Sequence, residues 1–280
     1  MKIGITGATG QLGKLVIDQL KGKVGKDNIV AFVRNPEKAK DLGVEARYFD
    51  YDKPEHLVEQ LKGIDSLFFI SANEIGQRVR QHKNVIDAAK KAGIKWLVYT
   101  SLLHADATTI NLAEEHLETE KLLKDSGIDY TILRNGWYTE NYTGSIEGAI
   151  AGGAFIGSAG TGKISSAARA DYAEAASVVL SNQSYKGKVL ELAGDNAYTL
   201  SDFAAEISKQ TGKNIPYKNL PEEEYAKILE SFNIPKGFAT AIASWDVSVS
   251  NGDLFDTTQQ LSKLIGRPTT SMAESVKAAL

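Results

Sequence analysis

Short, nearly continuous hydrophobic runs alternate with amphipathic stretches through the first half of the chain. Short apolar runs are typical of buried parallel strands, and apolar residues spaced by three and four predict helices. We therefore expect strands at residues 2–5, 29–33, 44–49, 66–70, 96–100 and 130–133, with helices between them at residues 55–61, 76–92 and 113–125. This alternation predicts the α/β class, with a Rossmann-type, doubly wound parallel sheet.

The rest of the chain has a different character. A helix at 171–180 and a seventh strand at 189–192 are expected to complete the sheet. Residues 136–168 are rich in Gly, Ala and Ser, and helical patterns return at 201–211, where Ser201 is expected to be the N-cap, and at 222–232. We therefore expect a sheet domain at residues 1–135, completed by about 169–194, and a smaller, mainly helical lobe at residues 136–168 and 195–280.

The first strand leads directly into Gly7-x-x-Gly10-x-x-Gly13, after which a helix begins with an apolar face that includes Leu12 and Val16. Gly7 permits the turn, Gly10 lacks the Cβ that would face a pyrophosphate, and Gly13 allows close helix–strand packing. The N–H groups and dipole of the helix favour phosphate. The spacing differs from the commonest Gly-x-Gly-x-x-Gly fingerprint, but its place between two strands predicts a dinucleotide site.

The end of the second strand indicates which dinucleotide binds. Sites for NAD usually end this strand with Asp or Glu, which binds the ribose 2′-hydroxyl, whereas this chain has Arg34-Asn35 followed by Lys38. A guanidinium can hold a 2′-phosphate through two hydrogen bonds, although it can also be an ordinary surface arginine. We therefore favour NADPH over NADH as the cofactor.

Further candidates follow the other strands, because the carboxyl ends of parallel strands hold the ligand in such sheets. Asp50 could accept a hydrogen bond from the adenine amino group, with Tyr51 beside it, although a plain loop acid is as good an interpretation. The end of the fourth strand is expected near the ribose. Ser101 could be a catalytic hydroxyl or, as we favour, a cap.

The sixth strand ends in Arg134-Asn135-Gly136 and continues into aromatic and amide residues. Asn135 could hydrogen-bond the carboxamide of nicotinamide. Trp137, Tyr138 and Tyr142 could line a flat substrate site by stacking, or could instead form apolar core. Asn135 and Tyr138 are therefore candidates for positioning the reactants, and no side chain is assigned as a catalytic acid or base.

Composition describes an ordinary globular protein, with 42% hydrophobic and 24% charged residues. A net charge of −3 gives no reason to expect nucleic acid or an anionic membrane as a partner, and no apolar run approaches the length of a membrane span. The chain has no cysteine, which excludes disulfides and thiolate chemistry, and no secretory signal is recognisable at its start. We expect a cytoplasmic protein that is a monomer or homodimer.

Two other kinds of site, a phosphate-binding P-loop and a metal site, are not expected. Gly157-x-x-x-x-Gly162-Lys163 matches most of a phosphate-binding P-loop, but Ile164 stands where the Mg²⁺-binding hydroxyl belongs. The four histidines are scattered without the spacing of metal ligands, so no metal is expected.

Three segments together carry a family resemblance: Gly7-Ala8-Thr9-Gly10-Gln11-Leu12-Gly13, Arg34–Ala39 and Ser126–Asn135. The chain resembles the NmrA-like group of atypical short-chain dehydrogenase/reductases. Within that group it is most similar to type 2 NAD(P)H:quinone oxidoreductases and triphenylmethane reductases. The resemblance implies that NADPH contacts Thr6, Gly7, Ala8, Thr9, Gly10, Gln11, Arg34, Ser71, Ala72, Asn73, Trp137, Tyr138, Thr139, Glu140, Asn141 and Tyr142.

One departure from the wider superfamily bears on mechanism. Most short-chain dehydrogenases carry Tyr-x-x-x-Lys on the helix before the sixth strand, and alignment on Glu120 puts Leu112 and His116 at those places. Ketone reduction needs that acid, because the product is a strongly basic alkoxide. A quinone needs it less, since hydride addition gives a phenolate-type anion whose conjugate acid has a pKa of roughly 10, as in tyrosine.

These observations favour an NADPH-dependent oxidoreductase that transfers hydride to a quinone or a similar flat acceptor. A non-catalytic NADP(H)-binding redox sensor of the NmrA type is the main alternative, because it too lacks the Tyr and Lys. A third hypothesis is an epimerase or reductase of a sugar or isoprenoid-like substrate. Its proton-transfer residue would be Glu118, Glu120 or His116, which are candidates by position only.

Overall fold

The computed structural model describes residues 1–280, which form two compact units. The first unit contains Met1–Asp106, Leu112–Asn135 and Arg169–Leu192. The second unit contains Ala107–Asn111, Gly136–Ala168 and Ala193–Leu280. The chain therefore leaves the first unit and returns to it before the second unit is complete.

A seven-stranded parallel sheet, in the order β3-β2-β1-β4-β5-β6-β8, is the centre of the first unit. Its strands are β1 (Ile3–Ile5), β2 (Ile29–Val33), β3 (Glu45–Tyr48), β4 (Ser66–Phe69), β5 (Trp96–Leu102), β6 (Asp129–Asn135) and β8 (Val189–Leu192). This is the Rossmann order, which confirms the predicted fold class. The order reverses between β1 and β4, and that switch point is where such sheets bind ligands.

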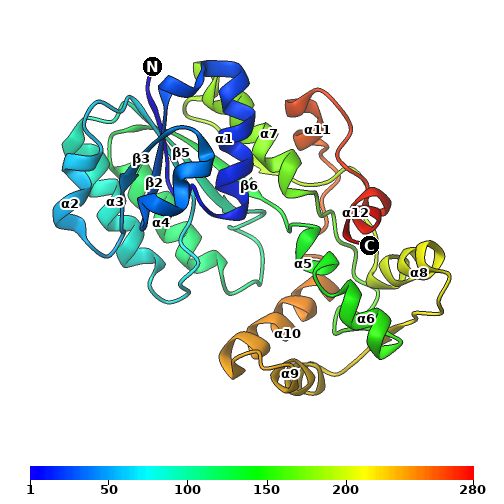
Figure 1. Ribbon diagram of the computed structural model, residues 1–280. Coiled ribbons are helices and arrows are strands. Elements are labelled where there is room, and N and C mark those ends of the chain that lie inside the picture. The colour runs from blue at the N-terminus through cyan, green and yellow to red at the C-terminus, as the bar shows by residue number, and fades with distance from the viewer. The chain divides into compact units, whose positions relative to one another are not determined.

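Helices cover both faces of this sheet, which explains why its central strands are apolar on both sides. Helices α1 (Gln11–Val24) and α7 (Arg169–Leu180) lie side by side on one face (Figure 1). The other face carries α2 (Pro54–Gln60), α3 (Arg78–Ala92) and α4 (Ala113–Asp125). Three short 3₁₀ helices complete the unit, at Lys26–Asn28, Pro36–Leu42 and Gln183–Tyr185.

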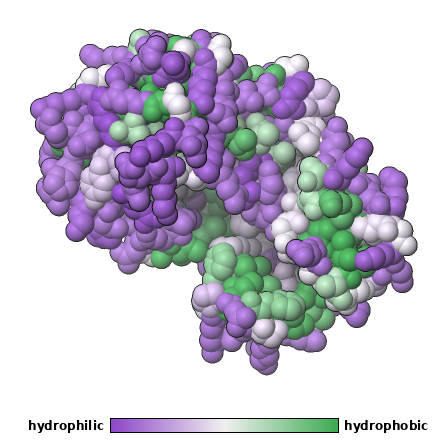
Figure 2. All heavy atoms as spheres, in the orientation of Figure 1, coloured by the Kyte–Doolittle hydropathy of each residue, from purple (hydrophilic) through white to green (hydrophobic).

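The second unit is mainly helical. It contains α5 (Glu140–Thr143), α6 (Ile146–Gly152), α8 (Leu200–Thr211), α9 (Glu222–Ser231), α10 (Lys236–Ser250), α11 (Gln260–Ile265) and α12 (Met272–Ala279). It also contains a two-stranded parallel sheet of β7 (Phe155–Gly157) and β9 (Tyr217–Asn219), which the sequence did not reveal. In Figure 2 hydrophobic residues gather on the visible surface of this unit, and Phe232, Phe238 and Phe255 are among its exposed side chains.

Two expectations about local structure are wrong. The N-cap of α8 is Thr199, not Ser201, because Thr199 and Asp202 form a reciprocal capping box that starts the helix at Leu200. Ser101 is not a cap either: it lies within β5, which extends beyond residue 100, and its hydroxyl donates to Glu120 Oε1 at 2.7 Å. No helix of the structure has the length and hydropathy that crossing a bilayer requires.

Candidate cofactor site

A cavity of about 470 Å³ lies in the first unit at the carboxyl ends of β1, β2, β3 and β4. It therefore spans the switch point of the sheet. The structure brings twelve of the predicted residues together in its lining: Gly7, Thr9, Gly10, Gln11, Leu12, Gly13, Arg34, Asp50, Tyr51, Ser71, Ala72 and Asn73. Thr6 and Ala8 belong to the same turn, but both are fully buried and neither lines the cavity.

The glycine turn has the geometry that an anion needs. Gly7 has a φ of +59°, and a Cβ on Gly13 would lie 2.5 Å from the carbonyl oxygen of Gly7, so neither position tolerates a side chain. Helix α1 begins after Gly10 with no side-chain cap and no acidic residue in its first turn. Its first N–H groups therefore remain available to phosphate oxygens at the positive end of the helix dipole.

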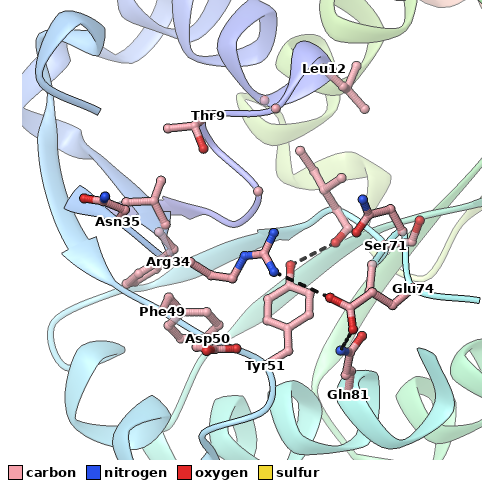
Figure 3. A pocket seen from close by; sticks show the side chains of 18 of the residues that line it. Thr9, Leu12, Arg34, Asn35, Phe49, Asp50, Tyr51, Ser71, Glu74 and Gln81 are labelled. Carbon is pink, nitrogen blue, oxygen red and sulfur yellow. Dashed lines mark hydrogen bonds and ion pairs between the residues drawn. The ribbon is translucent and has the colours of Figure 1, made fainter. Parts of the chain in front are cut away.

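Arg34 extends from the end of β2 across the cavity toward Glu74 (Figure 3). Its Nη1 lies 3.5 Å from Glu74 Oε1, and the two side chains are 70% and 44% exposed. Glu74 in turn accepts a hydrogen bond from Gln81 Nε2 at 3.0 Å. An exposed pair of this kind contributes little stability, so the guanidinium is available to another anion. Sequence reasoning missed Glu74, because no pattern links residues 40 positions apart.

Tyr51 links two strands of the sheet, whereas Asp50 holds the loop that follows β3. The Tyr51 hydroxyl lies 2.6 Å from Thr6 Oγ1 and 2.9 Å from the Ile70 carbonyl oxygen, so it ties the ends of β1 and β4 together. Burial raises the pKa of Tyr51 well above its ordinary value, and the phenol stays protonated. Asp50 lines the cavity, where its carboxylate accepts a hydrogen bond from the Asp52 N–H at 3.1 Å.

Polar groups at the ends of β5 and β6 are mostly committed to structural contacts. Thr100 Oγ1 accepts a hydrogen bond from the Ser71 N–H at 2.9 Å. Arg134 binds Glu120 through two contacts of 2.9 Å, and both side chains are almost completely buried. Asn135 is the exception: it is 6% exposed, and its Oδ1 is buried without a hydrogen-bond partner. Such an orphaned acceptor is costly. Asn135 does not line the cavity, so the structure does not bring this predicted residue together with the others.

The helix that carries Tyr and Lys in most short-chain dehydrogenases is α4, and it offers no exposed acid at those places. Leu112 precedes its first turn, and His116 is 6% exposed with Nδ1 2.8 Å from the Tyr99 hydroxyl. Burial lowers the pKa of His116 to about 3, so its imidazole is neutral. Burial raises the pKa of Glu120, but hydrogen bonds from Arg134 and Ser101 more than offset that effect. The pKa is therefore below its ordinary value, and the carboxylate stays ionised.

The predicted aromatic segment, Trp137–Tyr142, belongs to the second unit. The ring of Trp137 packs edge-on against Trp245, with centroids 5.5 Å apart. Tyr142 is 7% exposed and lies against Phe203, and Thr139 is buried with its hydroxyl 2.8 Å from Ser166 Oγ. Tyr142 and Thr139 thus belong to the packed interior of this unit. The predicted Tyr138, Glu140 and Asn141 lie in the same segment.

Comparison with known proteins gives consistent matches along the chain. The model of the NmrA-like family matches residues 1–271. Quinone oxidoreductase 2 of Escherichia coli (strain K12) is 55% identical over 277 residues, which are 98% of this chain and 97% of that protein.

Solved structures agree with these sequence matches. The crystal structure of an E. coli NADPH-dependent quinone oxidoreductase complexed with NADPH has a TM-score of 0.96 at 54% identity, with 99% of both chains covered. The Citrobacter sp. triphenylmethane reductase complexed with NADP(H) also has a TM-score of 0.96, at 37% identity over the whole of both chains.

Proposed function

The chain belongs to the NmrA-like family, and we propose that it is an NADPH-dependent oxidoreductase that transfers hydride to a quinone or a similarly flat, electron-deficient acceptor. One observation carries the proposal. The switch-point cavity joins an uncapped helix terminus to an exposed arginine, Arg34, in a chain that is 55% identical to a quinone oxidoreductase over nearly its whole length. When bound, the cofactor would supply the hydride.

Residues of the first unit would hold such a cofactor along its length. The first N–H groups of α1 would hold the pyrophosphate, and Arg34 would hold the 2′-phosphate in place of its present contact with Glu74. Asp50 would accept from the adenine amino group, and Ser71 to Asn73 would lie along the ribose. The orphaned Oδ1 of Asn135 would accept a hydrogen bond from the nicotinamide carboxamide.

The choice of a quinone rests on the missing proton donor. His116 is neutral and buried, and Glu120 is held ionised by Arg134, so α4 supplies no acid to an alkoxide product. A quinone stabilises the added charge by becoming aromatic, and water can protonate its phenolate-type product. The same facts count against an epimerase or ketone reductase that draws its proton from Glu120 or His116.

We further propose that catalysis is mainly proximity and orientation. The first unit would hold the cofactor, and Asn135, Trp137 and Tyr138 would position the two reactants. The enzyme would act in the cytoplasm as a monomer or homodimer without a nucleic-acid partner. The support is its need for the intracellular pool of NADPH and its net charge of −3.

Stopped-flow oxidation of NADPH against a panel of benzoquinones and one triphenylmethane dye tests the proposal, with cyclohexanone as the matched ketone control. We expect rapid oxidation with the quinones and none with the ketone. Binding of NADPH without oxidation by any acceptor would replace the proposal with the redox-sensor alternative. Turnover of the ketone alone would contradict the argument from the missing acid.

A further inference from the structure

The segment between β4 and α3, residues 70–77, forms one wall of the cavity and contains neither helix nor strand. Ser71, Ala72, Asn73 and Glu74 all line the cavity from this loop. A loop without regular hydrogen bonds needs other partners to keep one shape. Beside the contacts of Tyr51 with Ile70 and of Thr100 with Ser71, these partners include side chains of α3 and α4.

Both backbone polar groups of Ala72 are held by α3. The Ala72 N–H donates to His82 Nε2 at 2.9 Å, and the Ala72 carbonyl oxygen accepts from Arg78 Nε at 2.6 Å. His82 is fully buried and Arg78 is 8% exposed. Both side chains are thus shielded from water, and loss of one leaves a half-buried polar group of Ala72 without its partner.

The second layer of contacts comes from α4 and holds the other ring nitrogen of His82. A backbone N–H can only donate, so His82 Nε2 must be the acceptor, and the ring proton of the neutral imidazole is on Nδ1. Nδ1 lies 2.8 Å from Thr119 Oγ1, which donates its own proton to the Glu115 carbonyl oxygen at 2.8 Å. Burial, with smaller electrostatic effects of the neighbouring His116 and Arg78, lowers the pKa of His82 to about 3 and keeps the ring neutral.

Glu115 also binds the far end of the loop. Its Oε1 accepts from the Gly76 N–H at 3.0 Å and from the Arg78 N–H at 3.2 Å, and its Oε2 lies 3.9 Å from Arg78 Nη1. Residues of α4 therefore reach the loop by two routes, one through His82 and one directly. None of these contacts involves the Leu112 and His116 places of α4, where the catalytic pair of related dehydrogenases would stand.

We infer that Arg78, His82, Glu115 and Thr119 are positioning residues of the cofactor site, and that they set NADPH affinity by fixing the backbone of Ala72 in the cavity wall. The inference rests on the proposed function. Helix α4 therefore acts on cofactor binding, although Leu112 and His116 stand where related dehydrogenases carry Tyr and Lys. It shapes the wall against which the cofactor lies and supplies no proton.

His82→Phe and His82→Gln test the inference together. Phe keeps the ring packing, since His82 lies edge-on to Phe69 with centroids 4.8 Å apart, but it cannot accept from Ala72. Gln can accept from Ala72 and donate to Thr119. We expect His82→Phe to raise the Kd for NADPH about tenfold, with kcat and the quinone KM at saturating NADPH within about twofold, and His82→Gln to restore most of the affinity.

Thr119→Val and Thr131→Val complete the design. Without the Thr119 hydroxyl the imidazole loses the partner of its Nδ1 proton, so we expect a smaller rise in the NADPH Kd and no further rise in the double variant with His82→Phe. Thr131 Oγ1 accepts from Trp96 Nε1 at 3.0 Å in the same unit, but Thr131 does not line the cavity. Its variant controls for the loss of a comparable buried hydrogen bond.

An equal rise in the NADPH Kd for Thr131→Val and His82→Phe would overturn the inference, because general loosening of the unit would then explain both. So would additive effects of Thr119→Val and His82→Phe, or no recovery with His82→Gln. Thr119→Val keeps the imidazole in place and carries the test if His82→Phe does not fold. If the unaltered protein itself fails to bind NADPH, the proposed function is wrong, and the inference with it.

Discussion

Two arginine–glutamate pairs contact the loop between β4 and α3, and they differ in burial. Arg34 and Glu74 are 70% and 44% exposed and meet through one contact of 3.5 Å. Arg78 and Glu115 have side chains that are only 10% and 15% exposed, and each also binds the backbone of the loop. The first pair can exchange its partner for a ligand, whereas the second cannot do so without leaving a buried charge unpaired.

The contrast shows that burial, more than distance, decides which arginine is open to an anion. The exposed pair loses little when water or a phosphate takes the place of Glu74. In the buried pair, Arg78 Nη1 and Glu115 Oε2 make no hydrogen bond, and the ion pair between them, at 3.9 Å, is the contact that these two atoms have. We therefore propose that Arg34 recognises the ligand and that Arg78 maintains the shape of the loop.

The largest expected effect is on stability. Arg78→Leu removes the donor to the Ala72 carbonyl oxygen and leaves Glu115 without a cation, so the free energy of unfolding should fall by about 4 kcal/mol. Arg34→Leu is the matched control, and it should leave that free energy nearly unchanged because Arg34 is 70% exposed. Urea denaturation of both variants measures the difference. Equal losses would remove the distinction between the two pairs.

The next largest effect is a pH dependence of stability that originates in the buried His82. Burial lowers the pKa of His82 from 6.5 to about 3, so between these values the unfolded chain binds a proton that the folded chain does not. His82 therefore contributes stability above about pH 6.5 that is lost as the pH falls, by about 3 kcal/mol at about pH 4. The His82→Gln variant should therefore lose less unfolding free energy than the unaltered protein between about pH 7 and pH 4.

The control for this titration is His56→Gln, because His56 lies on the exposed surface with its side chain 59% accessible. Its unfolding free energy should follow that of the unaltered protein across the same pH range. Parallel curves for His82→Gln and the unaltered protein would mean that His82 does not stay neutral in the folded chain.

Much of this site could be predicted from the sequence. The glycine spacing, the apolar runs and the alternation of strands and helices were enough to place Gly7, Arg34, Asp50 and Ser71 at one edge of a sheet. In a parallel sheet all strand ends that carry ligands meet at that edge, so local patterns determine a global arrangement. Arg34 at the end of the second strand favoured NADPH, and the family resemblance with the missing Tyr-x-x-x-Lys pair favoured a quinone as the acceptor.

The contacts that tune the site could not be predicted, because they join residues without a shared pattern. Glu74 is 40 positions from Arg34, and Glu115 is 37 from Arg78, so only the folded sheet brings them together. Strands β7 and β9 have three residues each, too few to show a period. Thr199 and Ser201 both suit an N-cap by residue type, and the hydrogen bonds between Thr199 and Asp202 decide which of them begins α8.

The smallest expected effect concerns Glu74. In the exposed pair its carboxylate competes with a 2′-phosphate for Arg34 and repels that phosphate, so Glu74→Gln should lower the Kd for NADPH about threefold and change that for NADH less. Glu59→Gln is the control for net charge, since Glu59 is an acid that is 66% exposed and paired with Lys62 away from the cavity. The same gain in both variants would show a long-range charge effect instead of a local one.

The central claim is that Arg34 is the group that recognises the 2′-phosphate. Fluorescence titration of Arg34→Ala with NADPH and with NADH tests it most directly, because the two cofactors differ only at that phosphate. The account predicts a Kd for NADPH raised at least tenfold with the Kd for NADH within about twofold of its original value. An equal loss of affinity for both cofactors would contradict it.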